Sequence, residues 1–142
     1  MKYTEKDLDI LARTIYGEAR GELYLYGISP LIAVANVVVN RYRKNFAKTI
    51  RDVCLAPYQF SCWNKNDPNY PVISEKYIDD VVFGKCREIA KNVLDEKWPD
   101  ITDGCDHYHS SIIKPYWAAR LKPKRIFGTQ YFYAFKNLKE KN

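Results

Sequence analysis

Apolar residues at the start of the chain recur every three or four positions, at Leu8, Leu11, Ala12, Ile15 and Ala19. This spacing places them on one face of a helix. Thr4 and Asp7 precede most of this run and match an N-cap followed by an acidic third position, a variant of the capping box. The pattern therefore predicts a first helix over residues 5–20.

The next segment is apolar almost all round and predicts a buried central helix. Ser29-Pro30 supplies a capping hydroxyl followed by proline, which is favoured in the first helical turn. Val34, Val37 and Val38 are β-branched and would also suit a strand. The length of the run and its Ser-Pro start favour a helix that ends near Arg43. Thr49 then predicts a short helix through Cys54.

Residues 56–73 hold three prolines and Trp63, which indicates a long irregular loop of the kind that often carries function. Ser74 follows as a candidate cap. An apolar stripe that includes Ile78, Val82, Ile89 and Val93 predicts the longest helix of the chain, over residues 74–97.

The last third has a different pattern. Residues 105–110 alternate, and residues 126–135 are aromatic and β-branched around Gly128-Thr129. These patterns predict two short strands or a small hairpin, with a turn and short helix over 114–120 between them. We therefore expect one mainly helical (α+β) domain over residues 1–142, with a small β element in its C-terminal third.

Composition adds two features. Twelve Tyr, six Phe and three Trp make aromatics 15% of the chain. These residues suit a core, but they also suit a groove in which sugar rings stack on flat side chains. The net charge is +6, which favours anionic partners, although it can also serve solubility alone. No long basic helix or arm is present, so we expect no nucleic-acid partner.

The four cysteines, at 54, 62, 86 and 105, match no Cys-x-x-Cys pattern, and free thiols are the expectation. Cys86 falls on the apolar face of its predicted helix. The chain has no apolar run long enough to cross a membrane, and its first residues lack the apolar stretch of a signal peptide. We expect no membrane insertion. The protein then acts where it is made, leaves the cell by lysis or another route, or has had a signal removed.

Glu18 is the strongest candidate for chemistry. It lies near the end of the first helix, between Gly17 and Gly21, and glycines leave room for a large ligand to approach. A carboxyl group in a partly buried site can hold a proton near neutral pH and donate it. Proton donation of this kind cleaves glycosidic bonds.

Glu22 is a candidate second carboxylate. On a continuous helix it would share a face with Glu18. However, Gly21 is a natural helix stop, after which Glu22 would turn away. We therefore favour a structural or substrate-orienting role for Glu22 and keep catalysis as the alternative.

Cys105, His107 and His109 occupy alternate positions and could face one way on a strand, as zinc ligands would. No fourth ligand is evident, so we expect no metal and no cofactor. One histidine is expected to line the groove while the other packs or pairs.

The runs Tyr16-Gly-Glu-Ala-Arg-Gly-Glu22 and Ala33-Val-Ala-Asn-Val-Val-Val-Asn-Arg41 resemble the signature of the cell-wall hydrolases typified by spore-cortex-lytic enzymes, domains that also occur in phage endolysins. Later segments are similar in the same order: Gln59-Phe-Ser61, Asp106-His-Tyr-His109, Pro115-Tyr-Trp117 and Ile126–Tyr133. Two positions depart from the family pattern. Gly104-Cys105 replaces a pair of small residues, and Gln130 stands where many relatives have histidine.

The resemblance implies a lysozyme-like, lytic-transglycosylase-related fold that cuts the glycan strands of peptidoglycan, with Glu18 as the catalytic acid. Substrate-binding residues are then expected from the long loop and the C-terminal strands: Gln59, Phe60, Tyr108, His109, Tyr131 and Tyr133.

The expected function is cleavage of the MurNAc–GlcNAc bond by a monomeric lytic transglycosylase. This enzyme would form 1,6-anhydro products in an endolysin or wall-remodelling role. A hydrolytic muramidase and a non-catalytic glycan-binding module are the alternatives.

Overall fold

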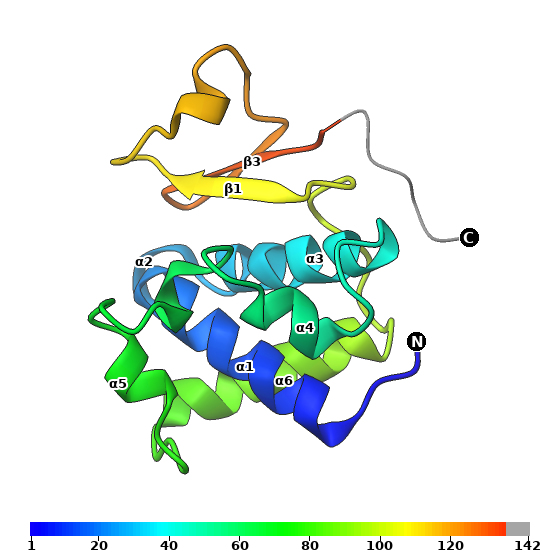
Figure 1. Ribbon diagram of the computed structural model, residues 1–142, viewed down its shortest axis with the longest axis vertical. Coiled ribbons are helices and arrows are strands. Elements are labelled where there is room, and N and C mark those ends of the chain that lie inside the picture. Colours follow the sequence, from blue (N-terminus) through cyan, green and yellow to red (C-terminus); the bar gives the residue numbers. More distant parts are fainter. Residues whose placement is uncertain (136–142) are drawn as a thin grey trace.

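Helices form a body, and a small sheet lies across one side of it in the computed structural model (Figure 1). The structure describes residues 1–135; the lysine-rich C-terminus from Lys136 lies outside the described residues. The elements in order are α1 (Glu5–Ala19), η1 (Arg20–Glu22), α2 (Leu23–Tyr26), α3 (Ser29–Arg43), α4 (Ile50–Leu55), η2 (Ser61–Trp63), α5 (Tyr70–Ile73), α6 (Val81–Leu94), β1 (His107–Ser110), η3 (Tyr116–Ala118), β2 (Arg125–Phe127) and β3 (Gln130–Tyr133).

The N-terminal helix begins as its sequence predicts. The Thr4 hydroxyl accepts a hydrogen bond from the Asp7 amide, and the Asp7 carboxylate accepts one from the Thr4 amide, which completes the capping box. Its apolar face packs against α3, α4 and α6 around the fully buried Leu11 and Ile15. The end of α1 is thereby fixed, and Glu18 lies in its last turn.

Helix α3 passes through the centre of the molecule, and this prediction is confirmed. Its valines are buried, together with three polar residues, Asn36, Asn40 and Arg41. Ser29 is the first residue of the helix rather than its side-chain cap. The Thr49 cap of α4 is confirmed, because the Thr49 hydroxyl accepts a hydrogen bond from the Asp52 amide at 3.0 Å.

The prediction of a helix from Ser74 is wrong. Ser74 lies at the end of α5, where its hydroxyl donates a hydrogen bond to the Tyr70 carbonyl at 2.7 Å. The long helix α6 begins at Val81, and the Asp80 carboxylate caps it by accepting from the Val82 amide at 3.0 Å. Serine and aspartate are both favoured N-cap residues. Asp80 caps α6 because its carboxylate accepts a hydrogen bond from a helix amide, whereas the Ser74 hydroxyl donates to a carbonyl of α5.

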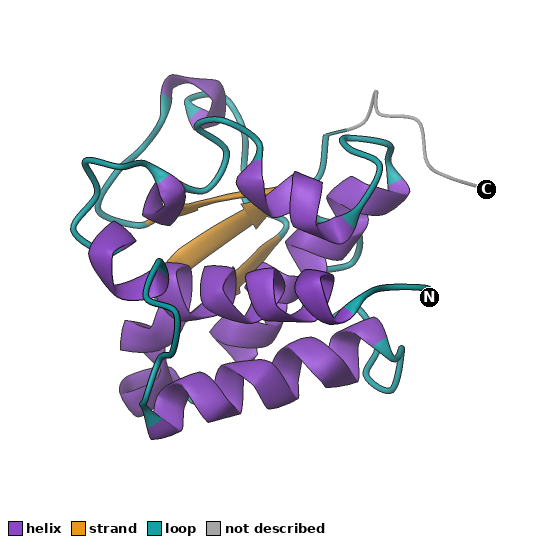
Figure 2. Cartoon of the chain, turned by 60° about the horizontal axis from the view of Figure 1, so that its bottom comes forward, coloured by secondary structure: helices purple, strands orange, loops and turns teal. Residues whose placement is uncertain are grey.

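The sheet is antiparallel with strand order β1-β3-β2. Gly128 turns the chain between β2 and β3 with a positive φ of 59°, a conformation that favours glycine. Tyr108 pairs with Phe132, and Ile126 pairs with Tyr131. Figure 2 shows the strands of the sheet together beside the helices. The predicted small β element in the C-terminal third is therefore confirmed. It has three strands, whereas the sequence predicts two short strands or a small hairpin.

A buried ion pair joins the sheet to the helices. Lys44 Nζ lies 2.8 Å from the carboxylate of Asp106, whose side chain is fully buried just before β1. Arg41 donates to the backbone carbonyl of the same residue at 2.7 Å. These contacts set how the sheet lies on α3. Within residues 1–135, no helix is both long and apolar enough to cross a membrane.

Candidate active site

A groove lies between the helical body and the sheet. Its empty volume is roughly 970 Å³, counting its open side. The helical side and the loop after α4 contribute Gly17, Glu18, Arg41, Tyr58, Gln59, Ser61 and Asn69. The sheet and the segment that follows β1 contribute Tyr108, His109, Ser110, Ile113, Pro115, Trp117 and Gln130. The groove therefore forms where segments distant in sequence meet at the end of α1.

The carboxyl group of Glu18 is half-buried in this groove and accepts hydrogen bonds from three sides. The Cys62 amide donates at 3.1 Å, and the Ser61 hydroxyl donates at 3.4 Å. The Tyr108 hydroxyl donates to the other carboxylate oxygen. These donors fix the direction of the carboxyl and stabilise the negative charge that remains after it gives up a proton.

Gly17 brings the Cys62 amide close enough to reach Glu18. A Cβ at position 17 would lie 2.7 Å from the Cys62 Cβ and 2.9 Å from its Sγ, far inside contact distance. The expectation that this glycine makes room for a ligand is therefore incomplete. The space that a side chain at Gly17 would occupy is filled by Cys62 of η2, which is part of the protein itself. Gly21 has open space around it.

Arg41 supplies the positive charge of the groove. Its guanidinium is held by the Asp106 carbonyl and, at 3.3 Å, by the Gln59 side-chain oxygen, and it lies 4.9 Å from the centre of the Phe60 ring. Burial lowers the pKa of Arg41, but an arginine side chain stays protonated in proteins. Arg41 therefore places a fixed cation on the Glu18 side of the groove.

Tyr108 connects the sheet to Glu18. Its ring stacks on Phe132 at 5.3 Å between centroids, and Phe60 lies at 6.4 Å. Burial and the neighbouring Glu18 carboxylate raise the pKa of Tyr108 well above its ordinary value. Tyr108 consequently acts as a hydrogen-bond donor to Glu18 throughout the physiological pH range.

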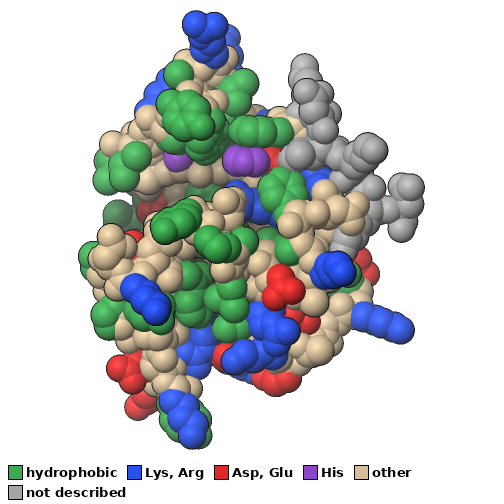
Figure 3. All heavy atoms as spheres, in the orientation of Figure 1, with side chains coloured by type: hydrophobic (Ala, Val, Ile, Leu, Met, Phe, Trp, Pro, Cys, Tyr) green, Lys and Arg blue, Asp and Glu red, His purple; other side chains and the backbone are tan. Residues whose placement is uncertain are grey.

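His109 lines the groove, but neither of its ring nitrogens is free. Its Nδ1 lies 2.7 Å from the Ser110 carbonyl, which can only accept, so Nδ1 carries the proton. Its Nε2 forms the second hydrogen bond of the ring, with the Tyr133 hydroxyl, also at 2.7 Å. His107 pairs with Asp106 and stacks on Phe135 instead. Figure 3 shows the histidines among apolar side chains above the helical body.

Glu22 lies outside the groove lining and holds the β2–β3 turn. Its carboxylate accepts from both the amide and the hydroxyl of Thr129 at 2.7 Å. A Cβ at Gly128 would lie 2.6 Å from the same carboxylate oxygen, so the glycine is needed for this contact. These contacts give Glu22 a structural role.

The structure divides the predicted site residues into two groups. Glu18, Gln59, Tyr108 and His109 line the groove, as expected. Three others do not: Phe60 is 1% exposed and Tyr133 3% exposed, so both support lining residues from behind, and Tyr131 packs edge-on against His109.

Several lining residues escaped prediction although the family-like segments contain them: Arg41, Ser61, Pro115, Trp117 and Gln130. Tyr58 is adjacent to one such segment. Asn69 carries no local signal, because the Arg20 guanidinium positions it from another part of the chain by donating to its side-chain oxygen at 2.8 Å.

The cysteines and histidines form no metal site in the described part of the chain, where no three His, Cys, Asp or Glu side chains converge on a common point. All four cysteines are free thiols, as expected, and all four are buried, as was expected of Cys86. Burial raises the pKa of each thiol, for example to about 12 for Cys54, so none of them supplies a thiolate nucleophile.

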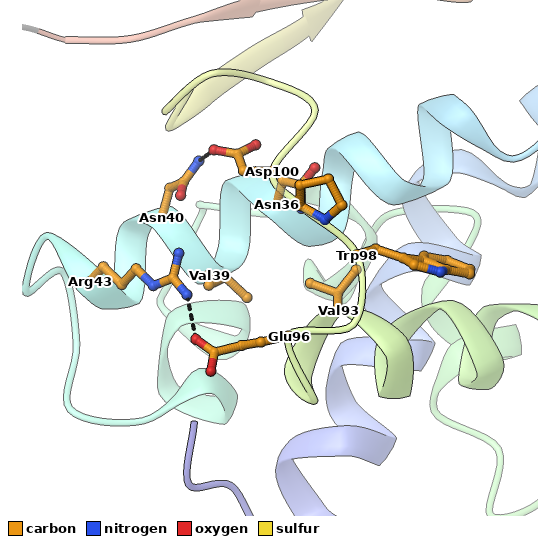
Figure 4. A pocket seen from close by; sticks show the side chains of 9 residues that line it. Asn36, Val39, Asn40, Arg43, Val93, Glu96, Trp98 and Asp100 are labelled. Carbon is orange, nitrogen blue, oxygen red and sulfur yellow. Dashed lines mark hydrogen bonds and ion pairs between the residues drawn. The ribbon is translucent and has the colours of Figure 1, made fainter.

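A second hollow lies between α3 and the end of α6 (Figure 4). The Arg43–Glu96 ion pair at 2.9 Å spans it, and the Asn40 amide donates to Asp100 beside it. It contains none of the predicted site residues. Arg43 and Glu96 pair with each other, and Asp100 is occupied by hydrogen bonds from Asn40, Thr102 and Gly104, so the hollow offers no comparable chemistry.

Comparison with known proteins supports the family resemblance. A model of the cell wall hydrolase family matches residues 29–133, well over half of the chain. The spore cortex-lytic enzyme of Bacillus cereus is 37% identical over 60 residues, which cover 42% of this chain and only 22% of that protein. Glu18 precedes the range of the family model, so its assignment depends on the groove geometry.

Two solved structures have the same fold. The catalytic domain of SleB from Bacillus cereus superposes with a TM-score of 0.63 at 24% identity, covering 92% of this chain and 91% of that one. The catalytic domain of the germination-specific lytic transglycosylase SleB from Bacillus anthracis gives a TM-score of 0.61 at 25% identity, covering 92% and 95%. The family model covers more than half of the chain, so this chain belongs to the cell wall hydrolase family, and the two solved structures share its fold.

Proposed function

We propose that this chain is a peptidoglycan-cleaving enzyme that cuts the MurNAc–GlcNAc bond as a lytic transglycosylase, with Glu18 as its acid. One observation carries the proposal. Glu18 is the only carboxylate among the described residues that line the groove. Hydrolysis of a glycosidic bond usually employs two carboxylates, one as acid and one as nucleophile or base.

The other candidates for a base are occupied. Glu22 holds Thr129 outside the groove, and both ring nitrogens of His109 are hydrogen-bonded. A lytic transglycosylase needs no second group, because the 6-hydroxyl of the muramic acid attacks its own anomeric carbon at high effective concentration.

The contacts of Glu18 suit both halves of this reaction. In the first half, Glu18 protonates the bridging oxygen. The Cys62 amide, the Tyr108 hydroxyl and the charge of Arg41 then stabilise the carboxylate that is left. In the second half, that carboxylate accepts the proton of the attacking 6-hydroxyl, which closes the anhydro ring and restores the acid.

The test combines one substitution with product analysis. Glu18→Gln keeps the shape of the side chain but cannot donate the proton, so cleavage of purified glycan strands should fall by about a thousandfold or more while the unfolding free energy stays nearly constant. Wild-type products should end in 1,6-anhydromuramic acid, one water lighter than the hydrolysed form by mass spectrometry.

Near-normal cleavage by folded Glu18→Gln would refute the role of Glu18. Reducing ends alone among the products would instead indicate a muramidase that activates water. Binding of strands without any cleavage by the wild type would indicate a glycan-binding module.

The same proposal treats residues 1–142 as a single catalytic domain that acts as a monomer on bacterial walls. An endolysin role and a wall-remodelling role are both compatible with it. The Bacillus anthracis relative is a germination-specific lytic transglycosylase, which supports the proposed reaction.

A further inference from the structure

The loop between α4 and η2 makes a tight turn at the edge of the groove. The Gln59 amide donates to the Ala56 carbonyl at 3.2 Å, which closes a four-residue turn with Pro57 second and Tyr58 third. Tyr58 has a φ of +62°. A positive φ at the third position after proline is typical of a type II turn, in which glycine or asparagine is the favoured residue at that place.

A tyrosine in this conformation is unusual and costs stability. Its Cβ crowds the backbone where φ is positive, which strains a bulky residue in particular. Within residues 1–135, three other non-glycine residues have a positive φ: Asn45, Glu96 and Asp103. Asparagine and aspartate tolerate this region well, so Tyr58 is the aromatic exception.

Packing does not account for the tyrosine. Tyr58 is 86% exposed, although it lines the groove that contains Glu18. Trp117, on the other side of the groove, is held by ring contacts with His107, His109, Tyr133 and Phe135. No such ring contact is formed by Tyr58 within the described residues.

We propose that Tyr58 is a sugar-binding platform: the turn places this residue at the edge of the groove, where one face of its exposed ring stacks on the C–H face of a pyranose ring of the glycan strand. This inference rests on the proposed function and adds a binding position to it. A flat ring with an apolar face and a polar hydroxyl suits a sugar, which presents both kinds of surface.

The experiment separates the strain from the ring. Tyr58→Gly relieves the positive φ and removes the ring, whereas Tyr58→Phe keeps both. Asn45→Gly is the matched control, because Asn45 has nearly the same φ, 65°, and lies outside the groove lining. Unfolding midpoints, KM and kcat on purified glycan strands are measured for all three variants.

Tyr58→Gly should unfold at the same or a higher denaturant concentration than the wild type, while its KM rises about tenfold with little change in kcat. Tyr58→Phe should keep a KM within about threefold of the wild type, since the stacking face remains. Asn45→Gly should leave both kinetic constants unchanged.

Binding is measured separately in the Glu18→Gln background by calorimetry with soluble glycan fragments, where adding Tyr58→Gly should weaken the Kd about tenfold. An unchanged Kd and KM in Tyr58→Gly would overturn the platform. A loss in Tyr58→Phe equal to that in Tyr58→Gly would do the same. Failure of the proposed function would appear differently, as wild-type protein that leaves the strands uncut while the binding measurement still reports on Tyr58.

Discussion

At the scale of single residues, Tyr108 shows how one hydroxyl serves Glu18, the proposed acid. The phenol is held protonated by burial and by the adjacent carboxylate, so it always presents a donor to Glu18. Its ring is separately anchored on Phe132. The hydroxyl and the ring can therefore be tested independently.

Tyr108→Phe removes the hydroxyl and keeps the ring. We expect kcat for strand cleavage to fall about ten- to a hundredfold, because a donor to the newly formed carboxylate is lost. The unfolding free energy should change by about 1 kcal/mol. Tyr16→Phe is the control, since it removes a similar bond to Asp80 outside the groove lining. A Tyr108→Phe enzyme with wild-type kcat would show that the bond is only structural.

Sequence reasoning identified Glu18, the proposed acid, as a groove residue, but it found only part of its surroundings. Glu18 and Gln59 lie in segments with a strong local pattern, and both line the groove. Phe60 lies beside Gln59, yet it points into the core, because residues in an irregular turn follow no alternation that would reveal their direction. Contacts such as Arg20 with Asn69 join residues far apart in sequence, and one chain gives no indication of them.

At the scale of elements, the contact of α1 with η2 positions the Cys62 amide. Gly17→Ala would place a methyl group against Cys62, and η2 would have to move away from Glu18. We expect a loss of about 1–3 kcal/mol in unfolding free energy and a lower kcat, measured by denaturant titration and strand cleavage.

Gly84→Ala is the matched control for this substitution. Gly84 lies inside α6, and a Cβ there would meet nothing within 4 Å. The change should stabilise the protein by up to about 1 kcal/mol and leave cleavage unaltered, because alanine favours the helix more than glycine does. Equal stability for Gly17→Ala and the wild type would show that η2 is not tightly held.

Elements with local start signals were predicted well, and those defined by distant contacts were not. Thr4 and Thr49 cap helices as expected, since each bonds to a residue three positions later. The pairing of β1 with β3 depends instead on how the strands lie on α3, and alternation within each strand does not select its neighbour. For this reason the hairpin was predicted and the three-stranded order was not.

At the scale of the whole molecule, the Lys44–Asp106 pair makes the attachment of the sheet sensitive to acid. Burial acts to raise the pKa of Asp106, but hydrogen bonds from His107 and Lys44 outweigh it and hold the pKa below the ordinary 3.8. A carboxyl with a lower pKa in the folded state adds stability above its unfolded pKa. That stability is lost as the pH falls through the folded pKa.

We therefore expect the unfolding free energy to decline below about pH 4, and to decline less steeply in Asp106→Asn. At neutral pH this variant should lose about 3 kcal/mol, because Lys44 keeps a buried charge without its partner. Asp103→Asn, at an exposed ion pair, should lose under about 1 kcal/mol. Denaturant titrations between about pH 3 and pH 7 measure both effects, and parallel curves for Asp106→Asn and the wild type would contradict this account.

The two glutamates at the end of α1 and in η1 each bind a different part of the sheet. Glu18 accepts a hydrogen bond from Tyr108 of β1, and Glu22 accepts one from Thr129 in the β2–β3 turn. Residues 111–124 connect β1 to β2. In the sequence they therefore lie between Tyr108 and Thr129, the two residues that the glutamates contact. This connection supplies the outer side of the groove through Ile113, Pro115 and Trp117. A change in the exposed part of this connection, such as Ile113, would therefore reshape the outer side of the groove without touching the contacts that hold the Glu18 carboxylate.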